Sequence, residues 1–186
     1  MLILASASPR RRKLLTQAGF EFHVHPAHIP EDPHPNEDPI AYVTRLAREK
    51  AETVFTQLSD PGIIVLGADT TVTLDNHILG KPENPEDAAR MLRLLSGRTH
   101  RVITGVSAVS ATRTQTAAEV TAVQFLTLSE EEIQAYIATG EPNDKAGAYA
   151  IQGRAARWIP RIEGCYFNVV GLPIALVSTL LESFHP

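Results

Sequence analysis

The strongest constraint on the fold is the alternation of short apolar runs with helical segments. Leu2 to Ala5 is an apolar run with the length of a buried strand, and Ser8-Pro9, a capping serine before a first-turn proline, starts a helix directly after it. Ile63 to Leu66 is a second such run. Two longer strand-like segments, Arg101 to Val109 and Val120 to Leu126, are sequence neighbours that could pair antiparallel. Strands mixed with helices predict an α/β or α+β sheet domain.

The remaining elements follow from helix caps, chain breaks and side-chain alternation. They are a strand over 20–24, a proline-rich loop over 26–38, a helix from Asp38 to about Leu58, a hairpin at Asp75-Asn76, helices over 84–97 and 129–140, a short strand near Trp158, and a final helix after Pro173. The run at Ile63 is expected to end in Gly67-Ala-Asp69-Thr70. With 186 residues and no internal repeat or composition shift, we predict a single domain over 1–186.

Composition limits the class of protein. The net charge of −4 argues against a general affinity for nucleic acid or anionic lipid, so any positive charge for phosphates must be local. The apolar runs are too short to cross a bilayer. The N-terminal apolar run precedes the basic residues, which is the reverse of a secretory signal. One cysteine, Cys165, fits a reducing compartment. We expect a cytoplasmic protein.

Four consecutive basic residues, Arg10 to Lys13, occupy the first turns of the helix that begins at Ser8. A helix N-terminus is already partly positive, so cations are disfavoured there unless an anion binds. Helical spacing places Arg10 and Arg11 on the side of the helix that faces the core, and Arg12 and Lys13 on the side that faces solvent. We predict the first two as phosphate ligands. The alternatives are a solubilising face and a nucleic-acid patch, although no aromatic residue interleaves the run.

Several acids and lysines are candidates for the same chemistry. Asp69 follows a buried strand, where α/β sheets usually place ligands, and its carboxylate could hold Mg²⁺ or orient a water. It could equally be a turn carboxylate. Lys81, Lys50 and Glu31 each have an ordinary surface or loop interpretation, and neither a P-loop nor a Rossmann fingerprint is present. The residue pattern alone does not assemble these groups into one site.

Six short motifs, taken in their order along the chain, are more specific than any single residue. They are Ser6-Ala-Ser8-Pro9-Arg10-Arg11, Gly67-Ala-Asp69-Thr70, Gly80-Lys81-Pro82, Ser96-Gly97-Arg98-Thr99-His100, Asp144-Lys145-Ala-Gly147-Ala-Tyr149 with Ile151-Gln152-Gly153, and Asn168-Val-Val-Gly171-Leu-Pro173. In this order they resemble the Maf family from end to end. The resemblance implies an α/β fold shared with inosine-triphosphate pyrophosphatases, with a mixed sheet, flanking helices and two lobes around a cleft. It also implies hydrolysis between the α- and β-phosphates of a nucleotide.

The resemblance assigns roles to matching positions. We expect Asp69 as the proton acceptor, with Lys50 and Lys81 as further catalytic groups. We expect a divalent cation, Mg²⁺ or Mn²⁺, at Glu31 and Asp69. The expected substrate contacts are Ser8, Arg10, Arg11, Thr70 and Gln152. The family also suggests a homodimer that acts on a small nucleotide, with no nucleic-acid or membrane partner.

Gln152 separates two branches of the family. The branch that acts on dTTP and UTP resembles this chain in having Gln-Gly, whereas the branch that acts on 7-methyl-GTP has an acidic residue at that position. A neutral amide offers one donor and one acceptor to the O4 and N3–H edge of uracil or thymine. We therefore expect a dTTP/UTP pyrophosphatase. The alternatives are a 7-methyl-GTP or broad-spectrum pyrophosphatase and a non-catalytic nucleotide-binding regulator of septum formation.

Overall fold

The computed structural model describes residues 1–184, which fold into two compact units. Unit 1 comprises residues 1–70, 104–119 and the chain from Gly171 on, and unit 2 comprises residues 71–103 and 120–170. Three long strands pass from one unit into the other: β3 (Ile64–Leu74), β5 (Thr99–Val109) and β6 (Thr114–Gln124). The prediction of a single domain over 1–186 stays a prediction.

The described strands form one mixed sheet in the order β2-β1-β3-β5-β6-β7, with β4 paired to β3. In unit 1, β1 (Leu2–Leu4) pairs in parallel with both β2 (Phe22–Val24) and β3. In unit 2, β4 (His77–Leu79) and β7 (Arg161–Glu163) pair antiparallel with β3 and β6. The predicted mixed α/β sheet with flanking helices is confirmed.

Helices flank this sheet in both units. Unit 1 contains α1 (Pro9–Gln17), α2 (Pro39–Leu58) and α6 (Ile174–Glu182). Unit 2 contains α3 (Pro85–Leu95), α4 (Glu130–Ile137), α5 (Tyr166–Val170) and the 3₁₀ turns η1 (Glu141–Asp144), η2 (Ala146–Ala148) and η3 (Arg154–Trp158). None of the helices in residues 1–184 has the length and apolar character needed to span a membrane.

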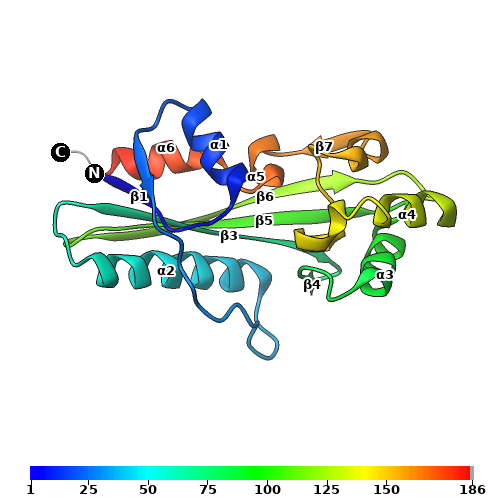
Figure 1. Cartoon of the computed structure of the whole chain (residues 1–186), viewed down its shortest axis with the longest axis horizontal. Helices are drawn as coiled ribbons and strands as arrows, with labels where there is room; N and C mark the ends of the chain where they lie inside the picture. Colours follow the sequence, from blue (N-terminus) through cyan, green and yellow to red (C-terminus); the bar gives the residue numbers. More distant parts are fainter. Residues whose placement is uncertain (185–186) are drawn as a thin grey trace. The chain divides into compact units, whose positions relative to one another are not determined.

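In unit 1, α2 lies on one face of the strands, and α1 and α6 lie on the other (Figure 1). The helix α2 approaches so closely that two strand positions must be glycine. A Cβ on Gly67 would lie 2.1 Å from the carbonyl oxygen of Ala47, and a Cβ on Gly105 would lie 2.3 Å from that of Val43. Both contacts are with backbone, which cannot move aside as a side chain can. This approach brings the next turn of α2 against β3.

Unit 2 has its own aromatic core around a buried histidine. The ring of His100 lies edge-on to Phe125 and Tyr149, with centroids 5.0 and 5.3 Å away, and its Nε2 lies 2.7 Å from the Tyr149 hydroxyl. Its Nδ1 is buried without a hydrogen-bond partner. Burial lowers the pKa of His100 to about 3, so the imidazole is neutral in the folded protein.

Most predicted element starts are confirmed, whereas one predicted strand end is wrong and one helix was missed. The caps at Ser8, Asp38 and Asn84 accept hydrogen bonds from the first turns of α1, α2 and α3, and Ser129 with Glu132 forms the expected capping box. However, β3 does not end at Gly67–Thr70 but continues to Leu74, because pairing with β4 extends it. The short strand predicted near Trp158 is present as Arg161–Glu163, and Trp158 itself ends a 3₁₀ turn. The helix α5 was not predicted.

Candidate active site

Asp69 lies inside β3 and not at the end of a strand, which corrects the expectation from its sequence context. Its side chain points to the face of β3 that Gly67 leaves open for α2, because residues two apart on a strand share a face. On that helix Lys50 is buried, and its Nζ donates to Asp69 Oδ1 over 2.7 Å. Two residues that are 19 positions apart therefore form a buried ion pair.

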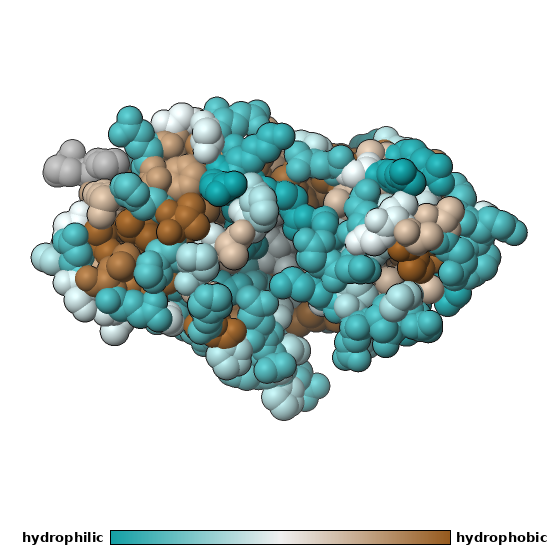
Figure 2. Space-filling view, viewed as in Figure 1, coloured by the Kyte–Doolittle hydropathy of each residue, from teal (hydrophilic) through white to brown (hydrophobic). Residues whose placement is uncertain are grey.

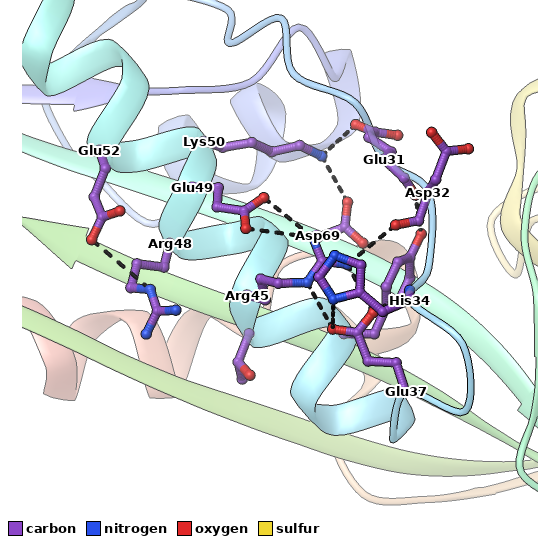
Figure 3. Close-up of polar contacts among 12 residues, drawn as sticks. Glu31, Asp32, His34, Glu37, Arg45, Arg48, Glu49, Lys50, Glu52 and Asp69 are labelled. Carbon is purple, nitrogen blue, oxygen red and sulfur yellow. Dashed lines mark hydrogen bonds and ion pairs between the residues drawn. The ribbon is translucent and has the colours of Figure 1, made fainter.

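Glu31 completes this cluster from the loop before α2. Its Oε1 lies 2.5 Å from Lys50 Nζ, so one ammonium group contacts two carboxylates (Figure 3). The loop is held in place because the Tyr42 hydroxyl donates to the backbone oxygen of Glu31 over 2.7 Å. Arg45 reinforces it by binding the backbone oxygen of Asp32. The structure thus brings together three of the predicted site residues.

Arg45 also anchors the end of this loop. Its Nε and Nη2 donate to the two oxygens of Glu37 over 2.7 and 2.8 Å, a bidentate ion pair (Figure 3). The hydrogen bond from Arg45 lowers the pKa of Glu37 to about 2. The loop therefore stays attached to α2 at neutral pH, which keeps Glu31 beside Lys50.

The electrostatics of the cluster favour a basic carboxylate. Burial, the largest effect, raises the pKa of Asp69 above its ordinary value, and the charges of Lys50 and Arg11 act in the opposite direction. A carboxyl group with a raised pKa holds a proton more strongly than an exposed aspartate does.

Arg11 occupies the opposite face of β3. Its guanidinium donates to the backbone oxygens of Ala68 and Gly171 over 2.9 and 2.8 Å, and to the hydroxyls of Ser6 and Thr70 over 3.2 and 3.0 Å. These bonds use four of the five N–H groups of an arginine. Burial lowers the pKa of Arg11. Arg11 therefore joins α1, β3 and the chain before α6, and phosphate binding by this residue stays a prediction.

The other residues of the basic turn lie as expected from helical spacing. Arg10 is partly buried, whereas Arg12 and Lys13 are exposed. The Ser8 hydroxyl accepts from the Arg11 amide over 3.4 Å and so caps α1. Binding of substrate by Ser8 and Arg10 is not tested by these contacts.

Thr70 belongs to the Arg11 side of the strand and not to the Asp69 side. Its Oγ1 lies 3.0 Å from Arg11 Nη2 and 2.9 Å from the hydroxyl of Thr104. Both partners lie within unit 1. Its expected role in specificity stays a prediction.

Lys81 and Gln152 belong to unit 2 and are both exposed. Lys81 follows β4 next to Gly80, whose carbonyl oxygen accepts from the Gly147 amide over 3.0 Å. Gln152 lies in a turn before η3. Their convergence with Asp69 on one substrate remains a prediction.

Sequence reasoning missed the residues that support Glu31. Tyr42 and Arg45 hold the loop but were not among the predicted site residues. A signal for Tyr42 is present, because Tyr42, Leu46 and Lys50 recur every four positions and therefore share one face of α2. A polar group in that otherwise buried stripe has to find a partner.

A shallow pocket of about 310 Å³ lies elsewhere in unit 1, at the edge formed by β2 and the N-terminal residue. Figure 2 shows apolar surface over this edge. The lining residues are Met1, Ile3, His23, Val24, His25, Leu58, Asp60 and Ile63, and they include neither a lysine nor an arginine. This pocket therefore lacks the side-chain cations that a triphosphate needs.

The carboxylates of the cluster fit a cation that arrives with phosphate. In residues 1–184, no group of three or more His, Cys, Asp or Glu side chains could hold a metal by itself. Mg²⁺ in nucleotide enzymes is usually bound by one or two carboxylates together with substrate phosphates and waters. Asp69 and Glu31 supply two carboxylates at one ammonium, which fits that mode.

Known proteins resemble this chain along its full length. The dTTP/UTP pyrophosphatase of Koribacter versatilis (strain Ellin345) is 53% identical over 181 residues, which cover 97% of this chain and 93% of the relative. The dTTP/UTP pyrophosphatase of Moorella thermoacetica (strain ATCC 39073 / JCM 9320) is 53% identical over 186 residues, which cover 98% and 94%. The solved structure of the Staphylococcus aureus Ham1 protein has a TM-score of 0.54 at 11% identity and covers 98% of both chains, which shows a shared fold. The model of the family described as Maf-like protein matches residues 1–184, and the chain belongs to this family.

Proposed function

We propose that this chain is a nucleoside triphosphate pyrophosphatase that hydrolyses dTTP and UTP to the monophosphate and pyrophosphate. The observation that carries the proposal is the buried Asp69–Lys50–Glu31 cluster, in a chain that is 53% identical to two relatives with the name dTTP/UTP pyrophosphatase. The cluster combines a basic carboxylate with cation-binding groups, as phosphoryl transfer requires.

Asp69 is the proposed proton acceptor. Water attacks the α-phosphorus of the nucleotide. The bond from this phosphorus to the oxygen that bridges the α- and β-phosphates breaks, and pyrophosphate leaves with the bonding electrons. Asp69 takes the proton of the attacking water, and its raised pKa favours this step compared with an exposed aspartate. Lys50 orients the carboxylate through the 2.7 Å contact. The barrier falls because the base is already held in place.

Positive groups hold the polyphosphate in this proposal. Lys50 and Lys81 stabilise charge on the leaving pyrophosphate, and Arg10, Arg11 and Ser8 contact the phosphates at the start of α1. A divalent cation, Mg²⁺ or Mn²⁺, held with the substrate by Glu31 and Asp69, would supply charge neutralisation and a more acidic water.

Gln152, together with Thr70, selects the base in this proposal. The amide offers a donor to O4 and an acceptor to N3–H of uracil or thymine. A carboxylate at this position would suit a positively charged methylated guanine better. This chemistry supports dTTP and UTP over 7-methyl-GTP.

The test is product analysis with a panel of nucleoside triphosphates, each with Mg²⁺, with Mn²⁺ or with a chelator. Monophosphate and pyrophosphate from dTTP and UTP, with metal only, are expected. Release of orthophosphate would shift the assignment to a phosphatase, and binding without turnover would favour a regulator of septum formation.

Asp69→Asn is the decisive variant. It should lose pyrophosphate release by a factor of roughly 10² to 10⁴, the usual contribution of a general base, while nucleotide binding survives. Asp60→Asn is the matched control, because Asp60 is an exposed turn carboxylate of the same unit whose Oδ1 accepts from the Gly62 amide. Full activity of Asp69→Asn would end the assignment.

Location and assembly are parts of the same proposal. We place the enzyme in the cytoplasm, where its free thiol, Cys165, stays reduced. We also propose a homodimer. Light scattering on the purified chain tests it, and a mass equal to one 20.3 kDa chain would contradict it.

A further inference from the structure

We propose that Tyr136 and Glu141 form a hydrogen-bonded clamp that positions Gln152 and thereby sets the preference for uracil-type bases. The proposal rests on the proposed function, in which Gln152 reads the base. Both clamp residues and Gln152 lie in unit 2. Tyr136 and Glu141 are positioning residues, because neither is proposed to touch the substrate.

Gln152 lies at the centre of a four-residue turn. The Gly153 amide donates to the Ala150 carbonyl oxygen over 3.0 Å, with Ile151 and Gln152 between them. The Gln152 side chain is exposed. The direction in which its amide points therefore depends on how the two ends of the turn are held.

Both ends of the turn are bound to one linked pair of side chains. At the start, the Ala150 amide donates to the Tyr136 hydroxyl over 3.3 Å. At the end, the Arg154 amide donates to both oxygens of Glu141 over 3.1 and 3.2 Å. The Tyr136 hydroxyl donates to Glu141 Oε1 over 2.8 Å and so connects the two ends. This chain of bonds closes a loop around Gln152.

The clamp is anchored in the core. Tyr136 is only 3% exposed, and its ring lies edge-on to Trp158 with centroids 5.0 Å apart. It is the next-to-last residue of α4 (Figure 1), whose start is fixed by the Ser129 capping box. The hydroxyl therefore has little freedom, and a bond to a carboxylate is stronger than one between neutral groups.

Gly153 is adapted to the same contact. A Cβ at this position would lie 1.8 Å from Glu141 Oε1, so any larger residue would displace the carboxylate from the turn. The backbone at Gly153 has a φ of −103°, which other residues adopt readily. The glycine is thus required by the space for Glu141 and not by backbone conformation.

A fixed amide discriminates where a mobile one cannot. Uracil presents an acceptor at O4 and a donor at N3, whereas cytosine presents a donor and an acceptor at the same places. UTP and CTP carry the same sugar and the same triphosphate. The ratio of their kcat/KM values therefore reports on the base contact alone, and a general loss of folded protein cancels from it.

The clamp itself is tested by amide hydrogen exchange measured by NMR. Tyr136→Phe removes the hydroxyl and keeps the ring, so exchange at Ala150 and Arg154 should become at least about tenfold faster. Tyr166→Phe is the control, since Tyr166 is an exposed tyrosine of unit 2 that lies outside the clamp. Unchanged exchange at both amides in Tyr136→Phe would overturn the clamp.

The role in selectivity is tested by kcat/KM for UTP and CTP in four variants. Tyr136→Phe should lower the UTP/CTP ratio about tenfold, the effect of one lost hydrogen bond, mainly by raising KM for UTP. Glu141→Gln keeps an acceptor and the shape, so it should lower the ratio less. Gln152→Ala should lower the ratio at least as far as Tyr136→Phe, and adding Tyr136→Phe to it should change nothing further.

The outcomes separate this inference from the proposed function. An equal fall of kcat/KM for UTP and CTP in Tyr136→Phe would overturn the positioning role and leave the pyrophosphatase assignment intact. A ratio in Gln152→Ala equal to that of the wild type would overturn base reading by Gln152 and the inference with it. No pyrophosphate release by the wild-type protein would refute the proposed function and the selectivity role. Amide exchange at Ala150 and Arg154 would still show whether the clamp exists.

Discussion

Replacement of His100 by glutamine should remove a large part of the acid sensitivity of this protein. His100 is buried among aromatic rings, and burial lowers its pKa from 6.5 to about 3. A group with a lowered pKa in the folded state stabilises the fold above its unfolded pKa. That stability is lost as the pH falls from 6.5 toward 3, because the unfolded chain binds the proton first.

The size of the effect follows from the two pKa values. At pH 5 an ordinary histidine in the unfolded chain is almost fully charged, whereas the imidazole of His100 stays neutral. The difference between pH 7 and pH 5 is about 2 kcal/mol of unfolding free energy. It hardly depends on the folded pKa as long as that value lies well below 5.

The assay is urea unfolding of the wild-type protein and His100→Gln at pH 7, 6 and 5. Trp158 is the sole tryptophan and packs near Phe125 in the same core, so its fluorescence reports on this unit. The comparison uses the difference between the proteins at each pH, so the titration of all other groups cancels. Glutamine keeps a group that can bond the Tyr149 hydroxyl.

The wild-type protein should lose about 2 kcal/mol more than the variant between pH 7 and pH 5. Parallel stability curves would refute the reasoning, because they would mean that His100 can be protonated in the folded state. A variant that is less stable by the same amount at every pH would show a packing role only.

Three further predictions concern unit 1. Lys50→Met should destabilise the fold by about 3 to 5 kcal/mol and abolish turnover, because it leaves the carboxylate of Asp69 buried without its cation; a Tm and activity equal to those of the wild type would contradict this. Gly67→Ala should cost about 3 kcal/mol or more, because its methyl group would meet the carbonyl oxygen of Ala47, and urea unfolding measures it. Glu37→Gln should reduce the loss of stability as the pH falls from 4.5 toward 2, the interval between the unfolded and folded pKa values of Glu37. If stability falls equally in the variant and the wild type over this interval, the ion pair with Arg45 does not cause the acid sensitivity.

Local signals in the sequence predicted the helix starts well. A cap such as Ser8, Asp38 or Ser129 acts on amides two or three residues later, so all the information lies within one turn. The hairpin at Asp75 and Asn76 was predictable for the same reason, since both residues adopt the positive φ that such turns require.

The length of β3 was not predictable from local signals. Its second half contains Thr71 and Thr73, which alternate with Val72 and Leu74 before the predicted hairpin, and no local signal joined this segment to the run at Ile63. They are buried in the strand because a neighbouring strand pairs with this part of the chain. β3 also lies beside β5, which comes later in the chain, so its full length depends on pairing with a distant segment.

The identity of the candidate site residues was predictable from the sequence, whereas their contacts in the structure were not. The resemblance to the Maf family pointed to Lys50, Asp69 and Glu31, which the structure joins through one ammonium group. It gave no sign that Arg11 bonds the backbone oxygens of Ala68 and Gly171, because every residue carries the same carbonyl group. A hydrogen bond to a backbone carbonyl does not depend on which residue carries that carbonyl, so the sequence does not reveal it.

The division of three strands between the two units has a consequence for protein engineering. Unit 1 is assembled from three stretches of sequence and unit 2 from two, with junctions inside β3, β5 and β6 and a fourth between α5 and α6. No contiguous gene fragment therefore encodes either half. A chimaera that imports unit 2 from a relative has to exchange residues 71–103 and 120–170 together, and the junctions inside the three strands have to preserve strand register.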